Sequence, residues 1–127
     1  MKLAIILALC LPAFAQVTTR TRDPQGNPEI TIKAVMPTTP TSLTTDKLRL
    51  KGILVVNNNA GSAVTITITD NSTDCASAAC PLVPTAVSIP ALTEVWFPLW
   101  DMPADGGITW SASASNVVAR VKATPTP

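Results

Sequence analysis

The stretch of sequence that decides the fold spans residues 47–69 and reads KLRLKGILVVNNNAGSAVTITIT. Its last part, Ala63–Thr69, alternates aliphatic residues with threonines, which predicts a strand with one apolar and one polar face. The NNNAG run at 57–61 is rich in residues that tolerate a positive φ, so it predicts a turn. We therefore expect Lys47–Asn57 and Ala63–Thr69 to pair as an antiparallel hairpin.

The first strand of this stretch changes phase near its middle. Leu48 and Leu50 share one face of the strand. Ile53 and Val55 also share a face, but the phase slips by one residue at Lys51–Gly52. A glycine at a phase slip predicts a β-bulge or a bend at that point.

Outward from this stretch, five further short segments show strand alternation between turn signals. They are Glu29–Val35, Thr85–Ile89, Glu94–Asp101, Ile108–Ser113 and Val117–Lys122. About seven short antiparallel strands without a sustained helical period predict an all-β domain over 29–123, a β-sandwich of the immunoglobulin-like or jelly-roll-like kind. We expect Trp110, which alternates with threonine and serine, to lie in its core.

Three segments show no such alternation. Residues 16–28 are polar and contain two prolines and a glycine, so we expect a flexible N-terminal arm, which a neighbouring chain's sheet could accept as a donated strand. Residues 36–45 read MPTTPTSLTT and predict an extended linker or long loop. Residues 124–127 are expected to form a disordered tail.

The first 15 residues have the pattern of a cleavable signal peptide. Lys2 provides a positive start, and Leu3–Leu11 is apolar but shorter than the roughly 20 residues that span a bilayer. Ala13-Phe14-Ala15 fits a cleavage site, which predicts a mature chain from Gln16 and a secreted, periplasmic or cell-surface location. The alternatives are a buried N-terminal helix and lipidation at Cys10, although Leu9 stands where a lipidation site needs a small residue.

Charge and composition exclude several classes of partner. The chain carries nine basic and eight acidic side chains and has a formal net charge of +1, so removal of Lys2 with the signal peptide leaves zero. Binding to nucleic acid needs a dense basic patch, so we expect no nucleic-acid partner. No later segment is long and apolar enough to predict a membrane span.

Two cysteines remain after the signal peptide, Cys75 and Cys80. In an oxidising compartment such a pair predicts a disulfide. The loop is short, so the bond would contribute only about 2 kcal/mol and would hold a local loop. Free thiols are the alternative, and a metal site is disfavoured because the chain has no histidine to complete four ligands.

The residue inventory argues against catalysis. Histidine and tyrosine are both absent from the chain, so serine–histidine and cysteine–histidine nucleophiles are excluded. The sequence contains no glycine-rich phosphate loop. Carboxylates remain as acid–base groups, but nearly all of them fall at predicted strand ends or turns. We therefore expect neither enzymatic activity nor a cofactor.

One acidic motif resembles the opening of a calcium loop. Asp70, Ser72 and Asp74 supply oxygen ligands at alternate positions. The rest of the motif does not fit, because Cys75 stands where an EF-hand needs glycine and Pro81 where it needs glutamate. An Asx-rich turn after a strand explains these residues more simply, and a weak calcium site is the alternative.

The tryptophans of the 94–101 strand are the candidate binding face. Trp96 and Trp100 are four residues apart, with Pro98 between them, so all three share a face in a regular strand. Exposed, they would form an aromatic platform for a sugar ring or another subunit. Alternatively the strand lies beneath residues 36–45 or the arm, and the need of a small domain for large core residues favours that interpretation.

The region from about Asp46 to Lys122 resembles small, uncharacterised β-sandwich modules of bacteriophage and prophage structural regions. The resemblance implies a β-sandwich and a role in a surface assembly, and it supplies no catalytic residue. The signal peptide and the Cys75–Cys80 loop depart from that pattern. The segments that carry the resemblance are Leu50-x-Gly52-Ile53, Val55-x-Asn57, Gly61-Ser62, Val64-x-Ile66-x-Ile68-x-Asp70, Ile89-Pro90-Ala91 and Gly106-Gly107-Ile108-Thr109-Trp110.

Together these patterns predict an exported, non-enzymatic β-sandwich that acts as a structural or interaction module at a surface. A protein partner or self-association is expected, through the Trp96–Trp100 face or an exposed strand edge. A carbohydrate-binding accessory module that uses the same tryptophans is the alternative.

Overall fold

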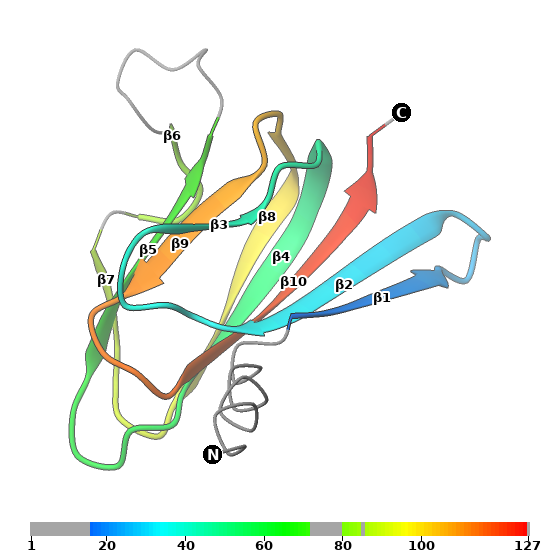
Figure 1. The fold of residues 1–127 in the computed structure, drawn as a ribbon. Coiled ribbons are helices and arrows are strands. Elements are labelled where there is room, and N and C mark those ends of the chain that lie inside the picture. The colour runs from blue at the N-terminus through cyan, green and yellow to red at the C-terminus, as the bar shows by residue number, and fades with distance from the viewer. Residues whose placement is uncertain (1–15, 72–79, 85, 127) are drawn as a thin grey trace, which may run out of the picture.

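The computed structural model describes residues 16–71, 80–84 and 86–126, and these residues form two antiparallel sheets with a common core (Figure 1). Sheet A has the order β1-β2-β10-β4-β8, and sheet B has the order β3-β9-β5-β6 with β7 also paired to β5. The strands of sheet A are β1 (Val17–Arg22), β2 (Pro28–Val35), β10 (Val117–Pro125), β4 (Leu48–Asn57) and β8 (Glu94–Ala104). Those of sheet B are β3 (Thr41–Thr44), β9 (Ile108–Ala112), β5 (Val64–Asp70), β6 (Cys80–Pro81) and β7 (Val87–Ile89).

The expected all-β class is confirmed, with more strands than the seven predicted. The described residues contain no helix, and therefore none that is long and apolar enough to cross a membrane. The additional strands, β1, β3 and β6, fall in segments that lack a regular alternation of apolar and polar residues, the signal from which strands were predicted.

The core lies between the two sheets and follows the alternation of the sequence. In β5, Val64, Ile66 and Ile68 are buried while the intervening threonines are half-buried or exposed. Sheet A contributes buried aliphatic side chains from β4, β10 and β2 to the same cluster. Trp110 of β9 is only 3% exposed, which confirms its predicted place in the core.

The predicted hairpin of residues 47–69 is wrong, although both of its strands exist. β4 lies in sheet A between β10 and β8, whereas β5 lies in sheet B beside β9 (Figure 1). The link between them, residues 58–63, crosses from one sheet to the other. Alternation shows that a strand has one buried face, but it does not show which strand it pairs with. Here β4 and β5 bury their apolar faces against each other across the core, from opposite sheets.

The predicted bulge at Lys51–Gly52 is confirmed on both sides of β4. Towards β10, Lys122 pairs with Gly52 and Ala123 with Leu50, so Lys51 has no opposite residue. Towards β8, the register also shifts between Leu50 and Gly52. The extra residue explains the phase slip, because it lets Leu50 and Ile53 both face the core.

The structure corrects the flexible arm predicted over 16–28. Val17–Arg22 forms β1, which pairs along its whole length with β2. Its six side chains are all exposed. Because none of them enters the core, none has to be apolar, and the sequence of β1 shows no alternation from which a strand could be predicted. The turn between the strands is held by Asp23, whose carboxylate accepts backbone N–H groups of Gln25 and Asn27.

Two further segments expected to be irregular also pair. Within the predicted linker 36–45, Thr41–Thr44 forms β3 and pairs with β9 at the edge of sheet B. In the predicted tail 124–127, Thr124 and Pro125 continue β10 opposite Arg49 and Leu48. β4 extends far enough to offer these residues backbone partners, and a proline at a strand end costs few hydrogen bonds.

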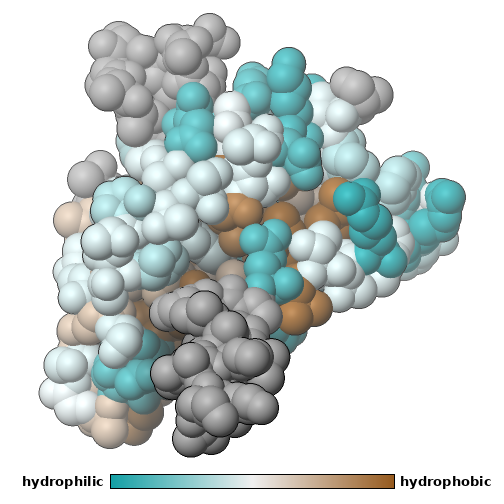
Figure 2. Space-filling view, in the orientation of Figure 1, coloured by the Kyte–Doolittle hydropathy of each residue, from teal (hydrophilic) through white to brown (hydrophobic). Residues whose placement is uncertain are grey.

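The two sheets diverge on the side of β1 and β3. Figure 2 shows apolar atoms in the opening between β3 and the β1–β2 hairpin. A groove of about 410 Å³ lies there. Its lining includes Thr18 and Arg20 of β1, Ile30 and Ile32 of β2, and Asp46.

Candidate interaction surface

The predicted binding face lies on β8, one of the two edge strands of sheet A, and it is exposed. Trp96 is 46% exposed, Trp100 is 85% exposed, and Pro98 between them is also exposed. The interpretation that buries this face beneath residues 36–45 or the arm is therefore wrong. The opposite face of the strand supplies Leu99 to the core, with Phe97 half-buried against it.

Trp96 lies over Gly52 on the outer face of sheet A, which is the face turned away from sheet B. Trp96 pairs with Leu54 across β8 and β4, and Gly52 is the diagonal neighbour. A methyl group at position 52 would overlap Cζ2 and Cη2 of the indole. Gly52, which has no side chain, thus forms the seat on which the Trp96 ring rests. Trp96 itself is still 46% exposed.

Sequence reasoning found Gly52 only as a bulge and missed its role as the seat of Trp96. The pairing of β4 with β8 brings the two residues together, and they are 44 positions apart in the chain. No local pattern carries that information.

Trp100 is presented by an irregularity in β8. Pro98 pairs with Gly52 and Met102 with Leu50, so three residues of β8 oppose the single residue Lys51. Trp100 and Asp101 have positive φ angles of 52° and 60°. A positive φ is unusual for a bulky residue, and here the backbone turns the Trp100 side chain into solvent.

The outer edge of β8 is poorly suited to accept another strand. Pro98 and Pro103 have no backbone N–H group, and the kink at Trp100 interrupts the strand between them. Natural proteins use prolines and bulges of this kind to prevent edge-to-edge pairing. The contacts that β8 can offer are therefore made chiefly by its side chains.

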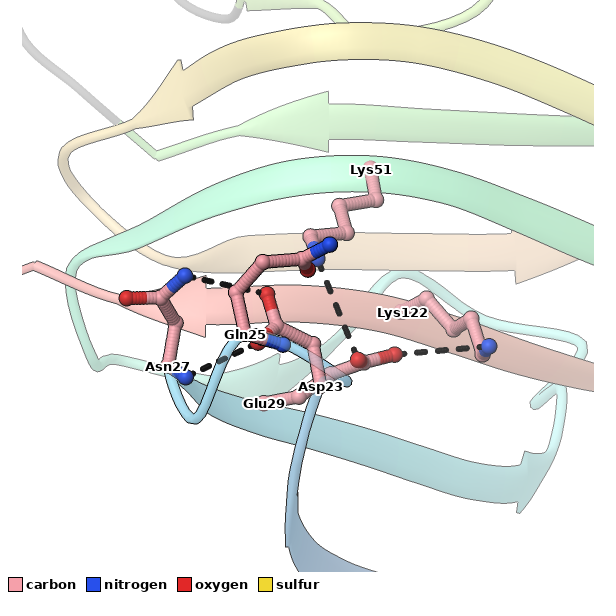
Figure 3. A network of polar contacts seen from close by, with 6 residues as sticks. All are labelled: Asp23, Gln25, Asn27, Glu29, Lys51 and Lys122. Carbon is pink, nitrogen blue, oxygen red and sulfur yellow. Dashed lines mark hydrogen bonds and ion pairs between the residues drawn. The ribbon is translucent and has the colours of Figure 1, made fainter.

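The outer face of sheet A is also charged. Glu29 of β2 forms ion pairs with Lys122 of β10 at 3.3 Å and with Lys51 of β4 at 3.8 Å. Figure 3 shows this cluster beside the β1–β2 turn, where Asp23 bonds to Gln25 and Asn27. The Glu29 side chain is largely buried between the two lysines, and its single negative charge offsets part of their positive charge.

The calcium and disulfide candidates are only partly within the described residues. Asp70 is buried, and its carboxylate accepts the backbone N–H groups of Asp105 at 3.3 Å and Gly106 at 3.0 Å, which holds the β8–β9 turn. Ser72, Asp74 and Cys75 lie outside the described residues. Cys80 starts β6 opposite Asp70, but its side chain is not described.

Comparisons with known proteins assign no family to this chain. No family model matches it, and no curated protein matches it. Among solved structures, a hypothetical protein from Leishmania major is similar over 88% of this chain and 72% of its own, with 13% sequence identity and a TM-score of 0.30. No function comes to the chain from that similarity.

Proposed function

We propose that this protein is an exported, non-enzymatic interaction module whose contact surface is the exposed aromatic edge of β8. The single observation that supports this most directly is the 85% exposure of Trp100. An indole left in water is an unused source of binding free energy, because tryptophan buries a large apolar area on contact and dominates many interfaces. Its partner is a protein surface, in the first instance a second copy of this chain.

The local backbone supports a binding role for Trp100 rather than a packing role. The side chain contributes nothing to the core cluster, yet the backbone holds it out at a positive φ. Strain of this kind costs about 1–3 kcal/mol per residue and is concentrated at functional sites. Pro98 and Pro103 direct the contact to side chains, since they weaken the edge as a template for strand addition.

The test is the solution mass of the protein by light scattering over a concentration series. We expect a reversible oligomer, and we expect the Trp100→Ala substitution to raise its dissociation constant at least tenfold. Leu92→Ala is the matched control, because Leu92 is also exposed, at 69%, and also has a positive φ, but lies in the turn before β8. A wild-type protein that stays monomeric at every concentration contradicts self-association.

A carbohydrate-binding module that uses Trp96 and Trp100 is the second candidate. The close contact of the Trp96 ring with Gly52 favours it, because an indole that is held in place and is still 46% exposed is suited to stack on a sugar ring. A polysaccharide should then protect the tryptophan fluorescence from acrylamide. Unchanged quenching at saturating polysaccharide would count against this candidate.

Other expectations from the sequence stay predictions. They are the immunoglobulin-like or jelly-roll-like assignment, the resemblance to phage structural modules, the Cys75–Cys80 disulfide, and export with cleavage before Gln16. The mass of the secreted protein, measured before and after reduction and alkylation, tests the last two together. An N-terminus other than Gln16, or free thiols on both cysteines, would contradict them.

A further inference from the structure

A single row of paired residues crosses the outer face of sheet A and ends at Trp96. Lys33 of β2 pairs with Arg120 of β10, Arg120 with Leu54 of β4, and Leu54 with Trp96 of β8. Directly paired residues share a face, so these four side chains stand side by side. With strands about 4.8 Å apart, the row from Lys33 to Trp96 is about 14 Å long. We call it the Trp96 row.

The cationic end of the row is not neutralised. Lys33 and Arg120 are directly opposite each other and both are exposed. Among the described residues no carboxylate lies within ion-pair distance of either one, whereas Lys51 and Lys122 share Glu29. Like charges directly opposite in a sheet are destabilising, so the fold gains nothing from this pair. An anion placed there would remove the repulsion.

A shallow hollow lies beside the cationic half of the row, next to Leu54, and Trp96 is not part of its lining. It has a volume of about 230 Å³, which is smaller than the roughly 300–1,000 Å³ of typical ligand pockets and suits a single ring-sized group. Leu54, Val56 and Val118 are half-buried and give it an apolar floor. Lys33, Arg120 and Asn58 supply its polar lining.

The charges of the chain are segregated in a way that its composition hides. On β2, β10, β4 and β8 the outer face carries five basic and two acidic side chains, and Asp101 in the irregular part of β8 is a further exposed carboxylate, which leaves a net charge of at least +2. The five basic residues are Lys33, Arg49, Lys51, Arg120 and Lys122, and the two acidic ones are Glu29 and Glu94. Of the other carboxylates among the described residues, Asp23, Asp46 and Asp105 lie in turns and Asp70 is buried in β5.

We infer that the Trp96 row binds an acidic polysaccharide, with a sugar ring stacked on Trp96 and a carboxylate or sulfate between Arg120 and Lys33. The inference extends the proposed contact surface, since it uses Trp96, but it depends on neither Trp100 nor self-association. A flat face with one aromatic platform, an apolar floor and spaced cations matches a linear chain of sugar rings with intermittent charges. Guanidinium and ammonium groups bind such anions by charge-assisted hydrogen bonds.

Single-stranded nucleic acid fits the face less well. Its binding sites combine a positive groove along every phosphate with several aromatic side chains for successive bases. The Trp96 row has one indole and two free cations, and Glu94 lies on the same strand as the indole. Nucleic acid is therefore an outcome of the test that would overturn the inference.

The test is calorimetric titration of the purified protein with polygalacturonate, dextran and a single-stranded oligonucleotide at two salt concentrations. We expect binding to polygalacturonate that weakens with salt, and at least tenfold weaker binding to dextran. The double variant Lys33→Gln/Arg120→Gln should lose at least tenfold in affinity and most of the salt dependence. Trp96→Ala should lose affinity to a similar extent but keep the salt dependence.

Arg20→Gln/Lys47→Gln is the matched control, because it removes the same two kinds of charge from exposed positions outside the Trp96 row: Arg20 pairs with Ile30, and Lys47 precedes β4. We expect less than a twofold change from it and from Leu92→Ala. Light scattering of the Lys33→Gln/Arg120→Gln variant should show unchanged self-association, which separates this inference from the proposed function. Thermal unfolding should show the Lys33→Gln/Arg120→Gln variant to be at least as stable as the wild type. Absence of polygalacturonate binding, equal binding to dextran, tighter binding to the oligonucleotide, or an equal loss in the control variant would each overturn the inference.

Discussion

Gly52 and Trp96 form a pair in which the absence of one side chain positions the other. Because a methyl group at position 52 would overlap the indole, we expect Gly52→Ala to displace the Trp96 ring from the sheet. The lost contact should lower the free energy of unfolding by about 1 kcal/mol. In a Trp100→Phe background, acrylamide quenching of the fluorescence should rise. Gly61→Ala is the control, because nothing lies near a methyl group there; equal quenching in both variants would contradict the seat.

Asn57 is the residue on which several loops depend. It is fully buried, and its amide nitrogen donates to the carbonyl oxygens of Ser62 and Ile89 at 3.0 Å and of Pro90 at 3.1 Å. Its amide oxygen accepts the backbone N–H of Asn59 at 2.9 Å. One side chain thus ties the end of β4 to the turn that leads to β5 and to the turn that leads to β8.

Asn57→Ala removes the amide donor of these three carbonyl groups, of which that of Ile89 is buried and those of Ser62 and Pro90 are partly buried. We expect the free energy of unfolding to fall by about 1–3 kcal/mol, measured by urea denaturation. Asn58→Ala is the control, because the Asn58 side chain is exposed and its backbone N–H makes the hydrogen bond to Asn116. A loss in the control as large as that in Asn57→Ala would show that the amide network has no special role.

Among the elements, the turn between β1 and β2 depends on an ionised carboxylate. The backbone N–H of Asn27 donates to Asp23 at 2.8 Å and, with the Asn27 side chain and the Gln25 backbone, lowers the pKa of Asp23 below its ordinary value of 3.8. A lowered folded-state pKa means that the stabilisation is complete above pH 3.8. It is then lost as the pH falls through the folded-state pKa.

We therefore expect the β1–β2 turn to loosen only below pH 3.8. The amide proton shifts of Asn27 and Gln25 should titrate together in NMR spectra, at a pH below that of the same residues in a short peptide. Asp23→Asn keeps an acceptor oxygen without a charge, so its turn should show no titration in this range. A midpoint equal to that of the peptide would contradict the lowered pKa.

Strands with one buried face could be predicted from the sequence, whereas strands with none could not. Alternation identified β2, β4, β5, β7, β8, β9 and β10, because each of these places side chains in the core. β1 has only exposed side chains, and β3 has four residues of which one is buried, so neither leaves a periodic signal. The pairing of β4 and β5 failed for a related reason: the turn at 57–61 was recognised, but a local turn does not specify which sheet the next strand joins.

At the scale of the molecule, the topology assembles the candidate site. The sequence singled out Trp96, Pro98 and Trp100 on one strand, and the structure leaves all three exposed. Lys33, Arg120 and Leu54 could not be associated with Trp96, because β2, β10, β4 and β8 are neighbours only after the chain has passed through both sheets. For the same reason the overall net charge of only +1 did not reveal a cationic face.

Because the two sheets share one core, we expect them to unfold together. Leu50 of sheet A and Ile66 of sheet B are both fully buried in one cluster. Replacing either with alanine leaves a cavity that both sheets line, so Leu50→Ala and Ile66→Ala should each lower the free energy of unfolding by about 3 kcal/mol. Leu92→Ala, on the surface, should change it by less than about 0.5 kcal/mol.

Native-state hydrogen exchange can resolve whether both sheets lose stability when one of them carries the substitution. In each core variant, we expect the slowest amides of β4 in sheet A and of β5 in sheet B to accelerate by the same factor, because neither sheet can keep its apolar face covered without the other. A variant that accelerates exchange only in the sheet that carries the substitution would show two independently stable layers. In that case sheet B, which is built from shorter strands, should be the first to open when the protein is heated.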